Sequence, residues 1–183
     1  MDGLKVIIEK LSQYNILTNI LPGTILCIVS TFCVGYNLLI TDNWYLQGVI
    51  FYFVGIVNNR FGSLVVEPLL KRLKILKFTS YKDYIAAESK DAKITILSTE
   101  NNVFRSCVSL CIIAISALIF KILEDKIEWV KNCDSEYKTM TLLVLLLVVF
   151  ILSYRKQTAY VNKRVNKVLE IDKEEKMNNS KEF

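Results

Sequence analysis

Residues 44–73 read WYLQGVIFYFVGIVNNRFGSLVVEPLLKRL. The stretch begins as an apolar helix and then places Asn58, Asn59 and Arg60 in a row. Glu67 follows seven residues after Arg60, so an α-helix returns it to the same face. Polar and charged groups at membrane depth are costly, and they normally face a protein interior or a water-filled path. The stretch therefore predicts a membrane-spanning helix that carries a polar stripe.

The composition extends this prediction to the whole chain. Its 183 residues are 52% hydrophobic, with a mean hydropathy of +0.35, and the apolar residues lie in four continuous blocks, 16–40, 44–57, 103–123 and 140–154. A spanning helix needs roughly 20 mainly apolar residues, so the second block must run on through Arg60 and the fourth must borrow flanking residues. Only helices and closed barrels satisfy the backbone in lipid, and the blocks do not alternate. We expect an all-α membrane protein with four transmembrane helices.

The distribution of basic residues predicts the orientation of these helices. Segment 69–105 and the tail from Arg155 each hold eight Lys and Arg residues, whereas the loop 124–139 holds three against five acids. Connection 41–43 holds none. Because Lys and Arg accumulate on the cytoplasmic side, both termini and the middle segment are expected in the cytoplasm. A plasma membrane is the expected location.

The parts outside the spans are short. Residues 1–15 have apolar positions at helical spacing and predict an amphipathic helix. The transmembrane domain is expected at 16–154, with a small cytoplasmic insertion at 74–102 in which Ser80 and Asp83 predict the cap of a helix 81–88. Residues 155–183 predict a helical continuation of the fourth span with a disordered end from about 172.

The residues that most catalytic sites require are missing from the sequence. There is no histidine, none of the five cysteines forms a CxxC pair, and no glycine-rich phosphate loop occurs. No serine or cysteine nucleophile has a histidine base, and no pair of acids lies within a span. We therefore expect no enzyme activity, no metal site and no cofactor.

The polar stripe has a functional and a structural interpretation. In the functional one, Asn58, Asn59, Arg60 and Glu67 line or gate a pore. In the structural one, the asparagines bond across helices and Arg60 extends to the lipid headgroups. Glu67 is then expected to pair with Arg60, to pair with a basic residue of another chain, or to be a solvated interface carboxylate.

Four basic residues follow the second span at once: Lys71, Arg72, Lys74 and Lys77. They are typical of the positive-inside rule and of attraction to anionic lipids. The more specific interpretation is that they form the cytoplasmic entrance of a pore, where they attract an anionic ligand such as a nucleotide or a nucleic acid.

The layout of the chain resembles that of small four-span membrane effectors in prokaryotic antiviral systems, and the phrase NNRFGSLVVEPLLK (58–71) is similar to such proteins. These are the Hailong membrane effector and the short transmembrane effectors of cyclic-nucleotide defence operons. The resemblance implies a homo-oligomeric pore that depolarises the inner membrane, regulated by an anionic nucleotide or oligonucleotide from a partner nucleotidyltransferase. It places ligand binding at Lys5 and Lys10 and at the basic run Lys71–Lys77.

Two other classes of function remain open from the sequence. A non-conducting scaffold or accessory subunit would dock a soluble partner through the middle segment and the tail. A small transporter or a holin-like lysis protein is the third class, although four spans without an inverted repeat give a transporter no central site.

Overall fold

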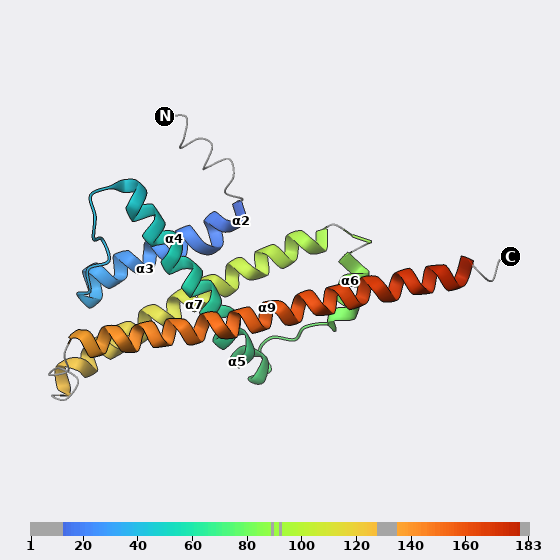
Figure 1. The fold of residues 1–183 in the computed structure, drawn as a ribbon. Helices are drawn as coiled ribbons and strands as arrows, with labels where there is room; N and C mark the ends of the chain where they lie inside the picture. The colour runs from blue at the N-terminus through green and yellow to red at the C-terminus, as the bar shows by residue number, and fades with distance from the viewer. Residues whose placement is uncertain (1–12, 89, 92, 128–134, 180–183) are drawn as a thin grey trace.

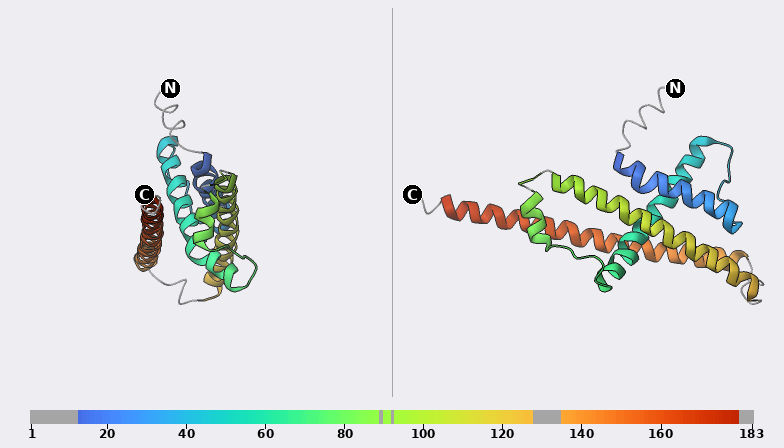
Figure 2. Two further views of the ribbon diagram at one scale, coloured as in Figure 1. Left: turned by 90° about the vertical axis from the view of Figure 1, so that its right-hand side faces the viewer. Right: turned by 180° about the vertical axis from the view of Figure 1, so that it is seen from behind.

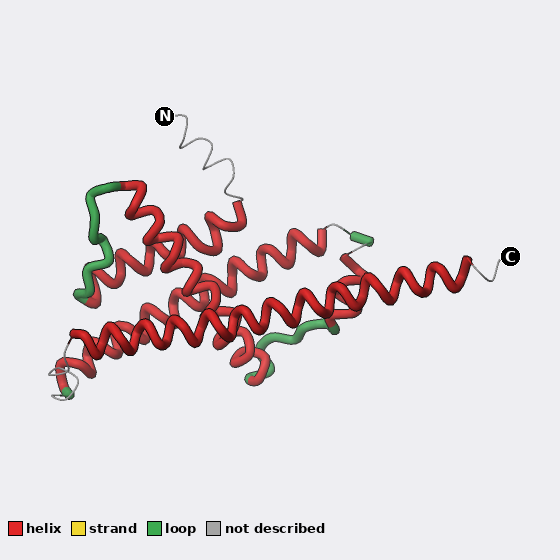
Figure 3. Tube along the Cα trace, in the orientation of Figure 1, coloured by secondary structure: helices red, strands yellow, loops and turns green. Residues whose placement is uncertain are grey.

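The computed structural model describes residues 13–88, 90–91, 93–127 and 135–179. Within these residues every regular element is a helix, which confirms the all-α prediction (Figure 3). Four helices are long and apolar enough to cross a membrane: Ile16–Val34, Trp44–Arg72, Lys93–Glu124 and Thr139–Lys167. The predicted amphipathic helix at 1–15 lies outside the described residues except for its last three.

The first of these helices ends earlier than the sequence predicted. It consists of α2 (Gln13–Asn15), the π-helix η1 (Ile16–Ile20), α3 (Leu21–Val29) and the π-helix η2 (Ser30–Val34). Gly35 follows in the left-handed conformation with φ 89°, which terminates the helix because only glycine adopts it without strain. The helix therefore ends inside the apolar block 16–40, and residues 35–40 belong to the loop.

The second helix runs through the polar stripe, as predicted. It comprises α4 (Trp44–Phe61), the π-helix η3 (Gly62–Val66) and α5 (Glu67–Arg72). Asn43 caps its start, since the side-chain oxygen accepts hydrogen bonds from the backbone N–H groups of Tyr45 and Leu46 at 3.0 and 3.4 Å.

Both prolines of the chain follow directly on a π-helical turn. Pro22 lies two residues after η1, and Pro68 lies two residues after η3. A proline ring in an α-helix clashes with the carbonyl of the fourth residue before it. That residue is Thr18 for Pro22 and Leu64 for Pro68, and each lies inside a π turn. The wider turn makes room for the ring, and the helix continues past the proline.

The remaining elements of the described residues are α6 (Tyr81–Glu88), α7 (Lys93–Lys126) and α9 (Ser135–Asn179). The predicted cap of α6 is confirmed, because the Ser80 hydroxyl accepts from the backbone N–H of Asp83 at 3.1 Å and donates to its carboxylate at 2.7 Å. The helical continuation of the fourth span is confirmed too. It runs to Asn179, past residue 172, from which the sequence predicts a disordered end.

The helices α3, α4 and α7 pack together, and α9 lies along the outside of this group (Figures 1 and 2). Helix α9 runs antiparallel to α7. The start of α7, helix α6 and the end of α9 share one end of the molecule, and the loop 35–43 lies toward the other (Figure 1).

Helices α3 and α4 cross at two glycines. A Cβ atom added to Gly55 would lie 1.8 Å from the backbone oxygen of Asn19, and one added to Gly23 would lie 1.8 Å from the backbone oxygen of Phe51. Backbones that approach this closely are a feature of membrane helices, where small residues form the interface. This crossing fixes the polar half of α4 against the start of the first helix.

Candidate functional site

A large cleft extends from the middle of α4 to α6, with a cavity volume of about 1150 Å³. Its walls come from α2, η1, α4, η3, α5, α6, α7 and α9, and from the loop between α5 and α6. Small-molecule sites commonly enclose about 300–1,000 Å³, so the cleft can hold a ligand of nucleotide size or larger.

The charge of the cleft is strongly positive. Its described lining holds one carboxylate, Glu67, against six basic side chains: Arg60, Lys71, Lys77, Arg105, Lys156 and Lys163. Concave surfaces of one sign concentrate ligands of the opposite sign. The arrangement favours an anionic ligand.

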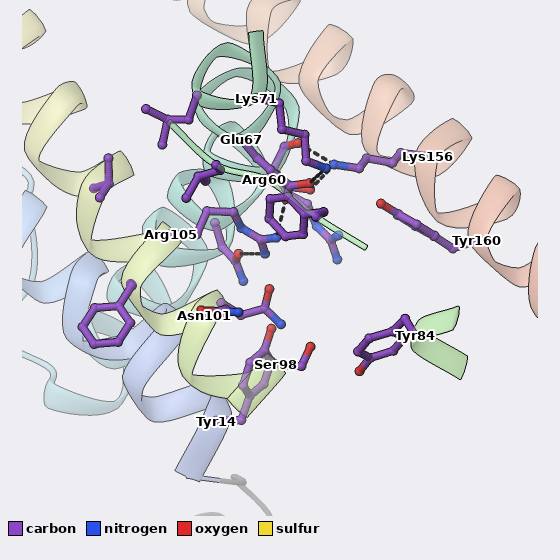
Figure 4. Close-up of a pocket in the computed structure, with 18 of the residues that line it drawn as sticks. Tyr14, Arg60, Glu67, Lys71, Tyr84, Ser98, Asn101, Arg105, Lys156 and Tyr160 are labelled. Atoms are coloured by element: carbon purple, nitrogen blue, oxygen red, sulfur yellow. Dashed lines mark hydrogen bonds and ion pairs between the residues drawn. The ribbon is translucent and has the colours of Figure 1, made fainter. Parts of the chain in front are cut away.

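Glu67 lies at the basic end of this cleft (Figure 4). Its carboxylate pairs with Lys71 at 2.7 Å and with Arg105 at 2.9 Å. Of the three alternatives expected for Glu67, the pair with Arg60 is not formed among the described residues. The π-helical turn η3 separates the two residues, so their seven-residue spacing no longer equals two α-helical turns.

Lys156 brings α9 to the same place. Its ammonium group donates hydrogen bonds to the backbone oxygen of Ser63 and to the Ser63 hydroxyl, the latter at 2.8 Å. Ser63 lies in η3, where the wider turn disturbs the regular α-helical hydrogen bonding. The π turn thus provides the acceptors that attach α9 to the second span.

Three of the cations in the cleft, Arg60, Lys77 and Lys163, take part in no ion pair or hydrogen bond with the described residues. Aromatic rings lie beside the charges. The Lys71 ammonium is 4.1 Å from the centroid of the Phe78 ring, and the Tyr81 and Tyr160 rings are 5.9 Å apart. An aromatic ligand that also carries a negatively charged group fits this combination, because its ring can stack on the aromatic side chains while its charged group meets the cations.

The predicted stripe divides between the cleft and the helix packing. Asn59, Arg60 and Glu67 line the cleft, whereas Asn58 is fully buried between α4 and α7. The Asn58 amide donates to the backbone oxygen and to the hydroxyl of Ser106, both at 3.0 Å. For Asn58 the structure thus shows the second interpretation, a bond across helices.

Asn58 belongs to a polar junction of three helices. The Ser106 hydroxyl donates to the backbone oxygen of Thr18 at 2.7 Å, and the Ser109 hydroxyl donates to that of Asn58 at 2.8 Å. Thr18, Asn58, Ser106 and Ser109 are all fully buried. In lipid, where water is not available, such hydrogen bonds hold helices together.

Of the predicted ligand-binding lysines and arginines, Lys71 and Lys77 line the cleft. Arg72 and Lys74 are exposed outside its lining. Lys5 and Lys10 lie outside the described residues.

Arg105 and Lys156 are cleft residues that were not predicted. The sequence does carry a signal for each of them, in the spacing of polar residues along the third and fourth helices. Polar residues recur on one face of the third span at Asn102, Arg105, Ser106 and Ser109. On the fourth helix they recur at heptad spacing, at Ser153, Lys156, Tyr160 and Lys163.

Compared with protein-family models, with curated proteins and with solved structures, the chain has no match in any of the three.

Proposed function

We propose that this chain is a multi-pass protein of the plasma membrane that binds an anionic nucleotide or oligonucleotide in its basic cleft. As a homo-oligomer it opens a pore under the control of that ligand. The observation that supports the proposal best is the charge of the cleft, six cations against one carboxylate among the described lining residues. A multiply charged anion compensates such an excess better than a neutral solute does.

The position of the cleft supports a cytoplasmic ligand. Its cations come from the second span, from the middle segment and from the fourth helix beyond 155, and the last two are the segments richest in Lys and Arg. The positive-inside rule assigns these segments to the cytoplasm, together with both termini. A ligand made by a soluble nucleotidyltransferase would reach the cleft from that side.

Conduction requires several copies of the chain. One set of four helices is too thin to enclose a wide channel, so the pore would form between subunits. Asn59 and Arg60, which are not fully buried, are the polar groups available to such a path. Depolarisation of an infected cell is the role that the resemblance to antiviral effectors adds.

The conduction test is the membrane potential of cells expressing the protein, with and without its neighbouring genes and an infecting phage. We expect wild type to depolarise the cells, and Asn59→Leu and Arg60→Ala to abolish the effect at equal membrane insertion. Arg72→Ala is the matched control, because Arg72 lies on the same continuous helix but outside the cleft lining. If wild type leaves the potential unchanged in every setting, the pore is excluded.

The binding test uses the purified chain in nanodiscs, with ATP and a 5′-phosphorylated oligodeoxynucleotide as probes. Because a hydrogen bond to a charged group is worth about 1.5–3 kcal/mol, Arg60→Ala and Lys77→Ala are each expected to weaken binding about tenfold or more. Arg72→Ala is expected to change it little. Equal affinity of all four proteins would contradict ligand binding in this cleft.

A non-conducting scaffold is the second candidate, and the buried polar junction favours it. Asn58, Ser106 and Ser109 bond within one chain and are fully buried, so they contribute no polar surface to a path. In a scaffold, substitutions at Asn59 and Arg60 would alter partner binding or stability while the membrane potential stays unchanged.

A further inference from the structure

Glu67 occupies the place in the cleft where an incoming anion would find the most donors. Its side chain is 11% exposed and is held by Lys71 and Arg105 at once. Arg60 and Lys156 lie around the same point (Figure 4). A carboxylate is itself an anion, so the chain already fills this part of its basic cleft with one of its own groups.

The donors around Glu67 suit a phosphate group better than a carboxylate. Arg105 uses one terminal nitrogen for Glu67 and the other for Asn59, and its buried Nε has no hydrogen-bond partner among the described residues. Guanidinium groups bind phosphate oxygens in a bidentate manner. A phosphate monoester also carries about −1.5 to −2 charges against the single charge of Glu67.

We propose that Glu67 is a built-in competitor of the ligand: a phosphate group and the Glu67 carboxylate compete for Arg105 and Lys71. This inference rests on the proposed binding of an anion in the cleft. Displacement of Glu67 breaks the ion pair that ties α5 to α7, and the phosphate takes its place on Arg105.

The replacement of Glu67 by a phosphate group also affects the first helix, through a chain of hydrogen bonds between side-chain amides. Arg105 donates to the Asn59 side-chain oxygen at 3.2 Å, and the Asn59 amide donates to the Asn19 side-chain oxygen at 3.2 Å. Asn19 donates in turn to the side-chain oxygen of Asn15 at 3.4 Å. A change in the position of Arg105 therefore acts on α7, α4 and the start of the first helix together. A ligand that favours the displaced arrangement shifts the protein toward it.

The test measures the affinity of the full chain in neutral phosphatidylcholine nanodiscs for ATP, wild type beside Glu67→Gln. Glutamine keeps the size of the side chain and removes the charge. Binding is expected to tighten at least about tenfold, because two like charges at the same donors repel strongly where the Glu67 side chain is only 11% exposed. The control is Glu88→Gln: Glu88 pairs with Arg164 on α9 but does not line the cleft, so affinity is expected to stay unchanged.

Two further variants show whether the gain acts through Arg105. In Arg105→Gln the ligand loses its main donor, and adding Glu67→Gln to this variant is expected to give less gain than it gives in wild type. Glu67→Asp keeps the charge on a side chain one methylene shorter. It is expected to bind ATP with an affinity between those of wild type and Glu67→Gln, and it keeps the test available if the glutamine variant does not fold.

A phosphate can come from a soluble nucleotide or from a lipid headgroup, and a second arm separates the two sources. It measures binding of a short-chain fluorescent phosphatidic acid, a lipid whose headgroup is a phosphate monoester, to the same proteins. A gain in Glu67→Gln toward ATP assigns the competition to a soluble ligand, and a gain toward the lipid alone assigns it to a headgroup. Both support the competition.

If wild type binds ATP or the lipid and Glu67→Gln binds no more tightly, Glu67 is not a competitor and the inference is overturned, whereas the proposed anion site stands. If neither probe binds wild type or any variant, the anion site itself fails. The two failures therefore give different results.

Discussion

Gly55→Ala is expected to separate α3 from α4 and to leave little folded protein. The added Cβ would lie 1.8 Å from the backbone oxygen of Asn19, 2.4 Å from its carbonyl carbon and 2.8 Å from its Cα. All three are backbone atoms, so no rotamer change relieves the overlap. Overpacking costs about 1–3 kcal/mol and occasionally more. A clash with backbone belongs at the upper end, and it outweighs the gain of roughly 1 kcal/mol in helix propensity from glycine to alanine.

Gly48→Ala is the matched control for this prediction. Gly48 lies on the same helix α4, and a Cβ there would meet no atom within 4 Å. The control is expected to be as stable as wild type or slightly more stable, since only the propensity term remains. The measurement is the apparent Tm and the monodisperse yield of each protein purified in mild detergent. Equal values for the two alanine variants would show that the helices do not cross at Gly55.

The sequence predicted the helical elements better than their ends and their mutual contacts. Four apolar blocks with alternating basic loops were enough to predict four helices, because length and hydropathy are properties of single segments. The end of the first helix was missed by several residues. Its signal was Gly35, whose left-handed conformation ends the helix although apolar residues continue to Ile40.

Only the part of the candidate site that lies on one helix could be predicted from the sequence, because a single segment shows its own residues but not the helices that it meets. The stretch 44–73 contributes four residues that the sequence marks as polar or charged near membrane depth, and the structure places all four in the cleft: Asn59, Arg60, Glu67 and Lys71. Arg105 and Lys156 come from helices that are distant in the sequence, and one chain without its fold does not reveal which helices meet. Glu67 does not pair with Arg60 for a local reason. The π turn η3 lies between them and shifts the helical register in a way that residue spacing does not show.

Asn58→Asp is expected to be among the most damaging substitutions in the chain, whereas the neighbouring Asn59→Asp is expected to be tolerated. Asn58 is fully buried, and its amide nitrogen faces the Ser106 backbone oxygen at 3.0 Å. Replacing that donor by a carboxylate oxygen sets two acceptors against each other. The Asn58 side-chain oxygen has no hydrogen-bond partner among the described residues, and the Ser106 hydroxyl donates to the backbone oxygen of Thr18. A buried charge without donors costs several kcal/mol.

Asn59 has the opposite surroundings although it is the next residue. Its side-chain oxygen already accepts from Arg105 at 3.2 Å, so a carboxylate there gains an ion pair. What it loses is the donation to the Asn19 side-chain oxygen. Turning the Asn19 amide over replaces that acceptor by a donor at the expense of the 3.4 Å bond to Asn15, and interhelical hydrogen bonds in membrane proteins are worth about 0.6 kcal/mol on average. The two changes are expected to leave the stability within about 1 kcal/mol of wild type.

The apparent Tm in detergent separates the two variants. For a chain of this size 1 kcal/mol corresponds to about 2–4 °C, so Asn58→Asp is expected to fall by about 10 °C or to aggregate, and Asn59→Asp by a few degrees at most. A similar loss in both would mean that neither side chain faces the partner described. If Asn58→Asp were as stable as wild type, Asn58 would have access to water. That result would return it to the candidates for a conducting path, because only a solvated site accepts the charge without loss.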